Sequence, residues 1–518
     1  MVRRTPSGAT ATVLVALLAG AAVRLWSLTT PALQLDGDQA VTGLMVDNIL
    51  AGRSQYVFVA GQNYNGALEQ WLQAAMYWAL PLPRNGFTLR LVEVALMAAA
   101  CWLTYAVGRR VLNSSWRAAL AAVLMALAPY WTFAKGSHSD GAYPSALIVG
   151  LLSIYCAMRL LEERRLRWAA AGGFLAGAVL WLGQTGIELL VPAALIALPV
   201  LARSARAWLV AAPAAAIGMA PSLAWSLRHH NFAVIDIHLQ TPPTSLGTRF
   251  HNVFGAILRE FIGVAGLGGA PGWPYLLQHL AVAALGVAFL VAVYRRRRGV
   301  LAVVMARTER RTPVDALLVS VPIVALIYVT SRSAWDAGTP KYLFVFTPVL
   351  LWLLAAAVPA RRPALGRVVA AGLAVVMVAT SMTMLVNRHD EYPGTSDAEL
   401  RTAIRYLVAH NYRDVYAEFW TAMPMLYLAD GALDIAPLRG GKAKFVGVFQ
   451  RVYTASSAVY VDSARTNGNA PTSRPPIDAM FQLHHIAFQK VQLGTVIIWT
   501  HISPMVRPWQ IGIGRAPT

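Results

Sequence analysis

The chain has 518 residues, of which 57% are hydrophobic and only 13% carry a charge. A soluble protein would carry about 25% charged residues, so the composition indicates a membrane protein. The net charge of +20 does not indicate a nucleic-acid partner, because arginines kept in cytoplasmic loops produce the same balance. Cys101 and Cys156 both lie inside apolar runs, which predicts neither a disulfide nor a cysteine metal site.

The N-terminus has the basic residues and apolar run of a signal peptide. No small-residue cleavage site follows before Arg24, and many similar apolar runs come later in the chain. We therefore interpret this segment as an uncleaved first membrane helix.

A membrane-spanning helix needs about 20 mostly apolar residues, and the chain offers about 11 such segments. The candidates lie near residues 9–28, 88–108, 116–134, 144–161, 168–183, 187–202, 208–227, 275–294, 314–331, 342–359 and 367–386.

The basic residues predict which ends of these spans face the cytoplasm. With a cytoplasmic N-terminus and every span crossing, each dense basic cluster falls on the cytoplasmic side. These clusters are Arg109 and Arg110, Arg159 to Arg167, Arg203 and Arg206, Arg295 to Arg311, and Arg361 to Arg367. The opposite side then receives residues 29–87, "AKGSHSDGAYP", residues 228–274 and "SRSAWDAGTPKY".

The tail from residue 387 has ordinary polarity and turn signals, and an odd number of spans places it outside. "SDAELRTAIRYLVAH" is typical of a helix, whereas "DVYAEFW", "KFVGVF" and "GTVIIWTHI" are typical of strands. We predict a membrane module over residues 1–386 and a small extracytoplasmic α/β domain over 387–518.

Two acids, Asp36 and Asp38, come directly after the first span. Asp38 is placed to cap the helix "QAVTGLMVDNILAG", and this structural role is one of two open interpretations. The helix is amphipathic, with Val41, Leu44 and Met45 on one side, which favours a position on the membrane surface.

A second segment, "YNGALEQWLQAAMYWALPLP", carries Trp71, Tyr77 and Trp78, residues that favour the membrane interface. The second interpretation of the acids follows from this setting. A carboxylate held at the interface can act as general base on a water-soluble acceptor while a lipid leaving group stays in the membrane.

The quoted motifs "DGDQAVTGLMVDNILAG", "VAGQNYNGALEQWL" and "PKYLFVFTPVLLWLL" resemble the GT-C superfamily of integral-membrane glycosyltransferases. Within it, the apolar part of the chain is similar to the group of protein O-mannosyltransferases and aminoarabinose transferases, which is glycosyltransferase family 39-like. The resemblance implies a GT-C-like multi-span helical fold with interfacial helices in the first outer loop, and inverting sugar transfer from a polyprenyl-phosphate donor.

The resemblance places the catalytic base on Asp38, with Asp36 as the second candidate. Gln39 stands where the family often has glutamate, and it can hydrogen-bond the substrate but cannot take a proton.

Further polar residues at the predicted outer face are candidates for substrate binding. For those in "KGSHSDGAYP" the alternative is an ordinary turn, which Gly141 and Pro144 favour. These candidates are Tyr64, Glu69, Lys135, His138, Asp140, Tyr143 and Glu188. Asp140 can position the acceptor or share a metal with the first-loop acids. Glu69 can instead pair with an arginine, and Glu188 can instead cap a helix.

The donor phosphate needs cations, and Arg24, Arg332 and Lys341 are the best placed. The alternative is that these side chains extend to lipid headgroups. The resemblance requires no cofactor and allows a divalent metal.

The expected partners are a polyprenyl-phosphate-linked sugar, membrane lipid and a glycan or protein acceptor, at the plasma (inner) membrane. A transporter or lipid flippase is the alternative function, and it would place charges near mid-span rather than at the outer boundary. A membrane sensor is a further alternative, and it would give the first-loop acids no chemical role.

Overall fold

The computed structural model describes residues 8–30, 35–127, 130–139, 141–230, 244–262, 273–307, 311–331, 334, 340–358, 368, 372, 375, 379, 395–438, 444–463 and 477–513. Contacts divide the chain into two compact units. The first comprises Met1–Trp26, Asn63–Glu69 and Val92–Leu385, and the second comprises Ser27–Gln62, Gln70–Leu91 and Val386–Thr518.

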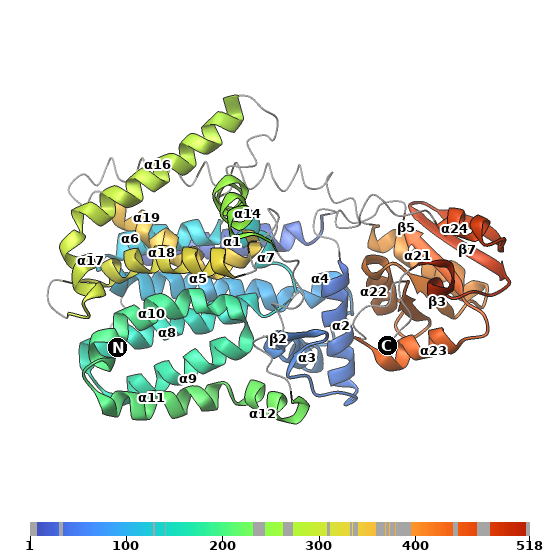
Figure 1. Ribbon diagram of the computed structural model, residues 1–518, viewed down its shortest axis with the longest axis horizontal. Helices are drawn as coiled ribbons and strands as arrows, with labels where there is room; N and C mark the ends of the chain where they lie inside the picture. The colour runs from blue at the N-terminus through green and yellow to red at the C-terminus, as the bar shows by residue number, and fades with distance from the viewer. Residues whose placement is uncertain are drawn as a thin grey trace. The chain divides into compact units, whose positions relative to one another are not determined.

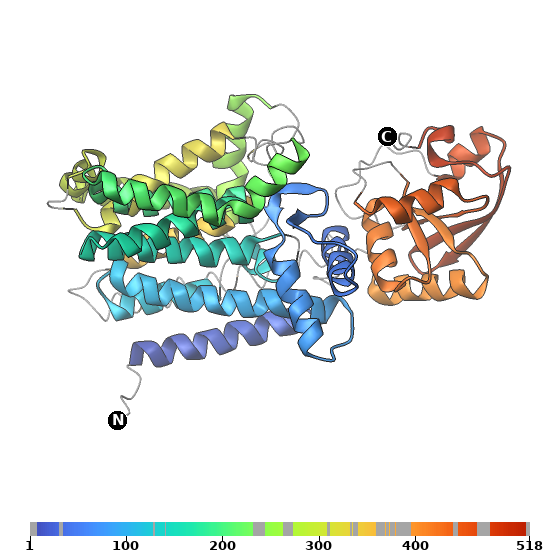
Figure 2. The same ribbon diagram turned by 90° about the horizontal axis from the view of Figure 1, so that it is seen from below.

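The first unit is helical, and its helices run side by side over much of their length (Figures 1 and 2). Its long helices are α1 (Gly8–Ser27), α5 (Leu91–Val111), α6 (Ser115–Ala126), α8 (Tyr143–Glu163), α9 (Leu166–Leu182), α10 (Ile187–Leu201), α11 (Ala205–Gly218), α12 (Ala220–His229), α16 (Trp273–Arg295), α18 (Pro313–Thr330) and α19 (Thr347–Ala357). Shorter elements are most of β2 (Gln62–Gly66), α7 (Tyr130–Lys135), η2 (Gln184–Gly186), α14 (Leu246–Asn252), η4 (Val253–Ile257), α15 (Leu258–Phe261), α17 (Arg297–Val304) and η7 (Pro340–Phe346).

Small residues bring α9 and α11 into close contact. A Cβ atom on Gly173 or Gly177 would collide with the carbonyl oxygens of Ala211 and Ala215 on α11. Glycines four residues apart on one helix face allow two backbones to approach, which is how helices commonly associate in a membrane. The pair α9–α11 is therefore packed as a membrane-helix pair.

Among the described residues, five helices are long and apolar enough to cross a membrane, or six if α11 and α12, which meet at 61°, form one bent span. The five lie at Gly8–Ser27, Gly86–Val111, Tyr143–Glu163, Gln184–Leu201 and Pro313–Thr330. Most other predicted spans coincide with shorter apolar helices, and the predicted span 367–386 lies almost wholly outside the described residues. The chain is thus a multi-pass membrane protein, and the count of about 11 crossings stays a prediction.

The second unit contains a five-stranded mixed sheet in the order β4-β3-β5-β7-β6. Its strands are β3 (Asp414–Ala417), β4 (Asp434–Pro437), β5 (Val459–Ser463), β6 (Ala487–Leu493) and β7 (Val496–Ser503). The helices around them are α21 (Asp397–Ala409), α22 (Phe419–Leu428), α23 (Val446–Thr454), α24 (Ile477–Leu483) and the short η8 (Pro508–Ile511).

Strand β3 runs parallel to both β4 and β5, and a helix connects each parallel strand to the next, as βαβ units require. Tyr416 lies opposite Tyr460, and Tyr460 lies opposite Trp499 in the antiparallel half. These aromatic residues are buried and form the centre of the sheet's core.

The predicted helix of this domain is present as α21, and two of the predicted strands are present as β3 and β7. Ser396 and Glu399 form the capping box that begins α21, and "GTVIIWTHI" contains β7. The predicted strand "KFVGVF" is wrong, because most of it belongs to helix α23. Phe449 and Val452 lie three residues apart and share one buried face of this helix. A short apolar run such as this one fits a helix and a strand equally well.

The second unit also contains α2 (Gly37–Leu50), β1 (Phe58–Val59) and α4 (Gly86–Leu89), together with most of α3 (Leu68–Ala79). The predicted surface position of α2 is not what the structure shows. Val41 and Met45 are fully buried, and the ring of Tyr427 on α22 lies directly against Gly43. The buried side of α2 is therefore covered by protein rather than by lipid.

Helix α3 has the opposite arrangement, with its polar residues inside and its large apolar residues outside. Glu69, Gln70 and Gln73 are fully buried, whereas Trp78 is 84% exposed and Trp71 is 40% exposed. An exposed apolar face of this kind suits the interface position predicted for this segment.

Candidate functional site

Asp36 and Asp38, the two candidate acids, have different roles at the start of α2. Asp36, not Asp38, is the N-cap, because its Oδ1 accepts a hydrogen bond from the Gln39 backbone N–H at 2.8 Å. An N-cap side chain satisfies a backbone donor that the helix leaves unpaired. The predicted capping role therefore belongs to Asp36, and Asp38 lies in the first helical turn.

Asp38 is accessible, since its side chain is 32% exposed. Its Oδ1 lies 3.4 Å from the Nζ of Lys444, which is only 12% exposed. The same ammonium lies 4.8 Å from the centroid of the Phe419 ring. The Asp38 carboxylate thus lies beside the Lys444 ammonium and in the first turn of α2. A neighbouring cation and a helix N-terminus both favour a negative charge.

Lys444 was not predicted from the sequence. The residue lies 406 positions after Asp38 and is the first residue of the segment "KFVGVF", which was predicted to be a strand. No local pattern connects two residues so far apart, so the sequence contains no signal that could have identified the pair.

Gln39 has a structural partner. Its Oε1 accepts a hydrogen bond from Arg90 Nε at 2.5 Å, and both side chains are buried. Asp397 lies close to Arg90, and burial raises the pKa of this carboxyl although Arg90 and Arg401 oppose the shift. Gln39 thus has a buried structural partner in Arg90, and its contact with the substrate stays a prediction.

In the first unit, several candidate residues surround the N-terminus of α8. Lys135 Nζ lies 5.3 Å from the Tyr143 ring centroid, and the Tyr143 ring packs edge-on to Phe344 of η7 at 6.1 Å. The backbone of Phe346 hydrogen-bonds the carboxyl of Glu188. Tyr143 and Glu188 therefore contact η7, and Lys135 lies against Tyr143.

Glu69 caps α8 from a distance in sequence. Its Oε1 accepts hydrogen bonds from the Ser145 backbone N–H at 2.9 Å and from Ser145 Oγ at 2.8 Å. A buried carboxylate at a helix N-terminus is stabilised by the unpaired backbone N–H groups there. The contacts with Ser145 give Glu69 a structural role at a helix end, and its role in acceptor binding stays a prediction.

The remaining candidates are less informative. Tyr64 and His138 are half-buried. Lys341 belongs to η7, and Asp140 and Arg332 lie outside the described residues.

Arg24 is 2% exposed. Its NH1 donates to the carbonyl of Ala126 at 2.8 Å, and its guanidinium lies 4.9 Å from the Phe133 ring centroid. These contacts hold Arg24 between helices, so its predicted contact with the donor phosphate would require a rearrangement.

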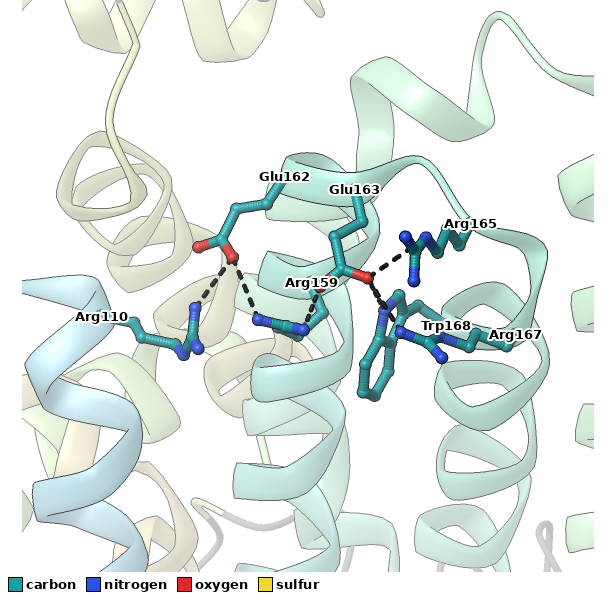
Figure 3. A network of polar contacts seen from close by, with 7 residues as sticks. All are labelled: Arg110, Arg159, Glu162, Glu163, Arg165, Arg167 and Trp168. Atoms are coloured by element: carbon teal, nitrogen blue, oxygen red, sulfur yellow. Dashed lines mark hydrogen bonds and ion pairs between the residues drawn. The ribbon is translucent and has the colours of Figure 1, made fainter.

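The other end of α8 carries a network of charges (Figure 3). Arg110 NH1 lies 2.8 Å from Glu162, and Glu163 accepts from Arg167 at 3.2 Å and from Trp168 at 2.8 Å. Arg159 pairs with both Glu162 and Glu163. Because α8 has 21 residues, the two ends are about 30 Å apart, which matches the apolar thickness of a bilayer.

The described residues contain no group of three or more His, Cys, Asp or Glu side chains that could hold a metal ion. Asp140, predicted from the sequence as a candidate metal ligand, is not among them.

The fold has counterparts among solved structures. ArnT from Cupriavidus metallidurans bound to undecaprenyl phosphate matches with a TM-score of 0.61 and 13% identity, over 95% of this chain and 98% of that chain. Its apo state matches with the same TM-score and coverage at 12% identity. The apo oligosaccharyltransferase of Archaeoglobus fulgidus matches with a TM-score of 0.49 and 13% identity, over 88% of this chain and 70% of that chain.

No protein-family model and no curated protein matches the sequence. The two ArnT structures nonetheless show that the chain shares the fold of that protein, and the predicted GT-C-like resemblance is confirmed at the level of fold.

Proposed function

We propose that this chain, which has the GT-C fold, transfers a sugar from a polyprenyl-phosphate donor to a hydroxyl group outside the membrane. The observation that carries the proposal is Asp38, an accessible carboxylate at the start of α2 with a cation beside it. ArnT, the structural neighbour over nearly the whole chain, is bound to undecaprenyl phosphate.

Asp38 acts as the general base. It accepts the proton of the acceptor hydroxyl while that oxygen bonds to the anomeric carbon, and the bond from this carbon to the phosphate oxygen breaks. The phosphate departs as an anion, so the reaction needs no second carboxyl as general acid, unlike glycoside hydrolysis. Attack opposite the leaving group inverts the anomeric configuration.

Asp36 is the weaker candidate for this role. Its carboxylate is already used as the N-cap of α2, and a proton acceptor must be able to approach the hydroxyl. We therefore assign Asp36 to holding the turn and Asp38 to the chemistry.

Polar residues of the first unit are the proposed binding groups for the acceptor, the sugar and the donor phosphate. Tyr64, Lys135, His138, Asp140, Tyr143 and Glu188 bind the acceptor or orient the sugar, and Arg332 and Lys341 bind the donor phosphate. The opposite end of α8 carries the arginine network, and the positive-inside rule places such a network in the cytoplasm. This supports an outer position for the η7 end of α8.

The test uses the purified full-length protein in lipid nanodiscs with a panel of polyprenyl-phosphate sugars and measures released polyprenyl phosphate. Asp38→Asn should lower the release rate by about 10²–10⁴-fold, the usual contribution of a general base. Asp36→Ser is the matched control, because serine keeps the capping oxygen and removes only the charge.

If Asp38→Asn releases polyprenyl phosphate at the wild-type rate, the proposed role of Asp38 is rejected. Movement of intact lipid between leaflets, without release from any donor, would instead support the flippase alternative.

A further inference from the structure

Lys444 is held at Asp38 by three segments of the second unit. Its ammonium lies 3.4 Å from Asp38 Oδ1 and 4.8 Å from the Phe419 ring centroid. Its alkyl stem packs on Gly61, where a Cβ atom would lie 3.1 Å from both Cγ and Cε of the lysine. Gly61 also has φ +78, a conformation that other residues adopt only with strain.

The partners of Lys444 are themselves tightly arranged. A Cβ atom on Gly37, the residue before Asp38, would lie 2.9 Å from the Phe419 ring. Phe419 therefore contacts the turn of α2 and the ammonium at the same time. This packing holds the Lys444 side chain in one position, unlike the side chain of a solvated surface lysine.

The proposed reaction moves one negative charge. At the start, Asp38 carries one negative charge and the phosphodiester of the donor carries another. At the end, Asp38 has gained the hydroxyl proton and is neutral, and the departed phosphate monoester carries both charges. A cation that can reach both groups therefore loses its partner at Asp38 at the moment when the phosphate gains charge.

We propose that Lys444 is this cation: it pairs with Asp38 in the resting protein and with the phosphate of the donor as the phosphate departs. The inference rests on the proposed function. Arg90 is a poor candidate for the same task, because its buried guanidinium is bonded to Gln39.

The experiment measures the binding of radiolabelled undecaprenyl phosphate to the full-length protein in nanodiscs. Lys444→Met, which keeps the length of the stem, should weaken binding by about tenfold, since a charge-assisted contact to phosphate is lost. Lys444→Arg should restore most of the affinity, because guanidinium also binds phosphate.

Lys490 provides a matched control within the same unit. Its Nζ lies 2.5 Å from Asp478 and 5.8 Å from the Trp499 ring centroid, so it repeats the lysine–aspartate–aromatic arrangement away from Asp38. Lys490→Met should leave the binding of undecaprenyl phosphate unchanged. Thermal unfolding of each variant shows whether the protein is folded.

A double-mutant cycle separates this role from a purely structural one. Asp38→Asn should tighten binding by about threefold to fivefold, because Lys444 no longer has to leave a carboxylate, a cost typical of a partly exposed ion pair. In the Lys444→Met background, Asp38→Asn should give no gain. A lysine that only holds α2 in place would not produce this dependence.

The two proposals fail differently. If the wild-type protein binds no undecaprenyl phosphate, the proposed use of this lipid fails, and the role of Lys444 fails with it. If the wild-type protein binds and folded Lys444→Met binds equally well, only the role of Lys444 is overturned. The role of Lys444 would also be overturned if Asp38→Asn tightens binding of undecaprenyl phosphate equally in the Lys444→Met background.

Discussion

Arg90 Nε donates a hydrogen bond to Gln39 Oε1 at 2.5 Å, and neither side chain reaches solvent. The charge of Arg90 also opposes the rise that burial causes in the pKa of Asp397. Removal of the arginine would leave the buried Gln39 Oε1 without its donor and would take a positive charge away from Asp397.

Arg90→Met should therefore destabilise the protein by about 1–3 kcal/mol, the cost of leaving a buried acceptor without its donor. Arg84→Met is the control, because Arg84 is 45% exposed and its pair with Asp47 should be worth about 1 kcal/mol or less. Thermal unfolding in detergent measures both variants. Equal losses would contradict the assigned role of Arg90.

Asp47, near the C-terminal end of α2, gives a prediction about pH. Burial raises the pKa of Asp47 from 3.8 to about 6, although Arg84 NH1 lies only 2.5 Å from its Oδ1. The folded protein thus binds this proton more tightly than the unfolded chain. The contribution is favourable when Asp47 is protonated, so stability should decline as pH rises from about 4 to about 6.

A shift of about two units corresponds to about 3 kcal/mol between the two ends of this pH window. Asp47→Asn should remove this part of the pH dependence and leave the rest of the curve unchanged. Unfolding temperatures at a series of pH values check the prediction. An unchanged slope between pH 4 and 6 in the variant would show that Asp47 is not its source.

Asp434 should behave in the opposite sense. Hydrogen bonds and the charge of Arg451, which lies 2.6 Å away, lower the pKa of Asp434. Its contribution to stability is present above the ordinary aspartate pKa and is lost as pH falls through the lowered value. Asp434→Asn should thus destabilise the protein at pH 7 and have little effect at the acidic end, measured by the same unfolding series.

Gly43 on α2 tests the packing of this helix against α22. A Cβ atom there would lie 2.5 Å from the Tyr427 ring, so Gly43→Ala should cost about 1–3 kcal/mol through overpacking. A Cβ atom on Gly447 of α23 would meet none of the described atoms within 4 Å, so Gly447→Ala should instead stabilise by about 0.5–1 kcal/mol. Unfolding temperatures that change in the same direction would contradict the packing described for α2.

The sequence identified the local motif of this region but not its packing. The order of acids, apolar helix and interfacial tryptophans is local, so the motif around Asp38 could be recognised from adjacent residues. The partners of Asp38 and Gln39 are Lys444 and Arg90, and such pairs depend on tertiary structure that no local period encodes.

Secondary structure could likewise be predicted only where a local sequence signal exists. Helix α21 is predictable because Ser396 and Glu399 mark its start, whereas α23 has no side-chain cap and its short apolar run is equally typical of a strand. The side of α2 that faces α22 could not be foreseen either. An apolar helix face suits a membrane surface or a protein partner equally well, and only the folded chain distinguishes the two.

Glu69 allows the structural and substrate-binding roles of a candidate residue to be separated. Its carboxylate accepts two hydrogen bonds from Ser145 at the start of α8. Glu69→Ala should destabilise the protein by about 1–3 kcal/mol, because buried donors lose their acceptor. Ser145→Ala removes the hydroxyl partner, and the double variant should lose less than the sum of the single losses. Thermal unfolding gives this coupling, and the KM for the acceptor is the second measurement. A raised KM for Glu69→Gln without any loss of stability would show that Glu69 binds substrate rather than capping α8.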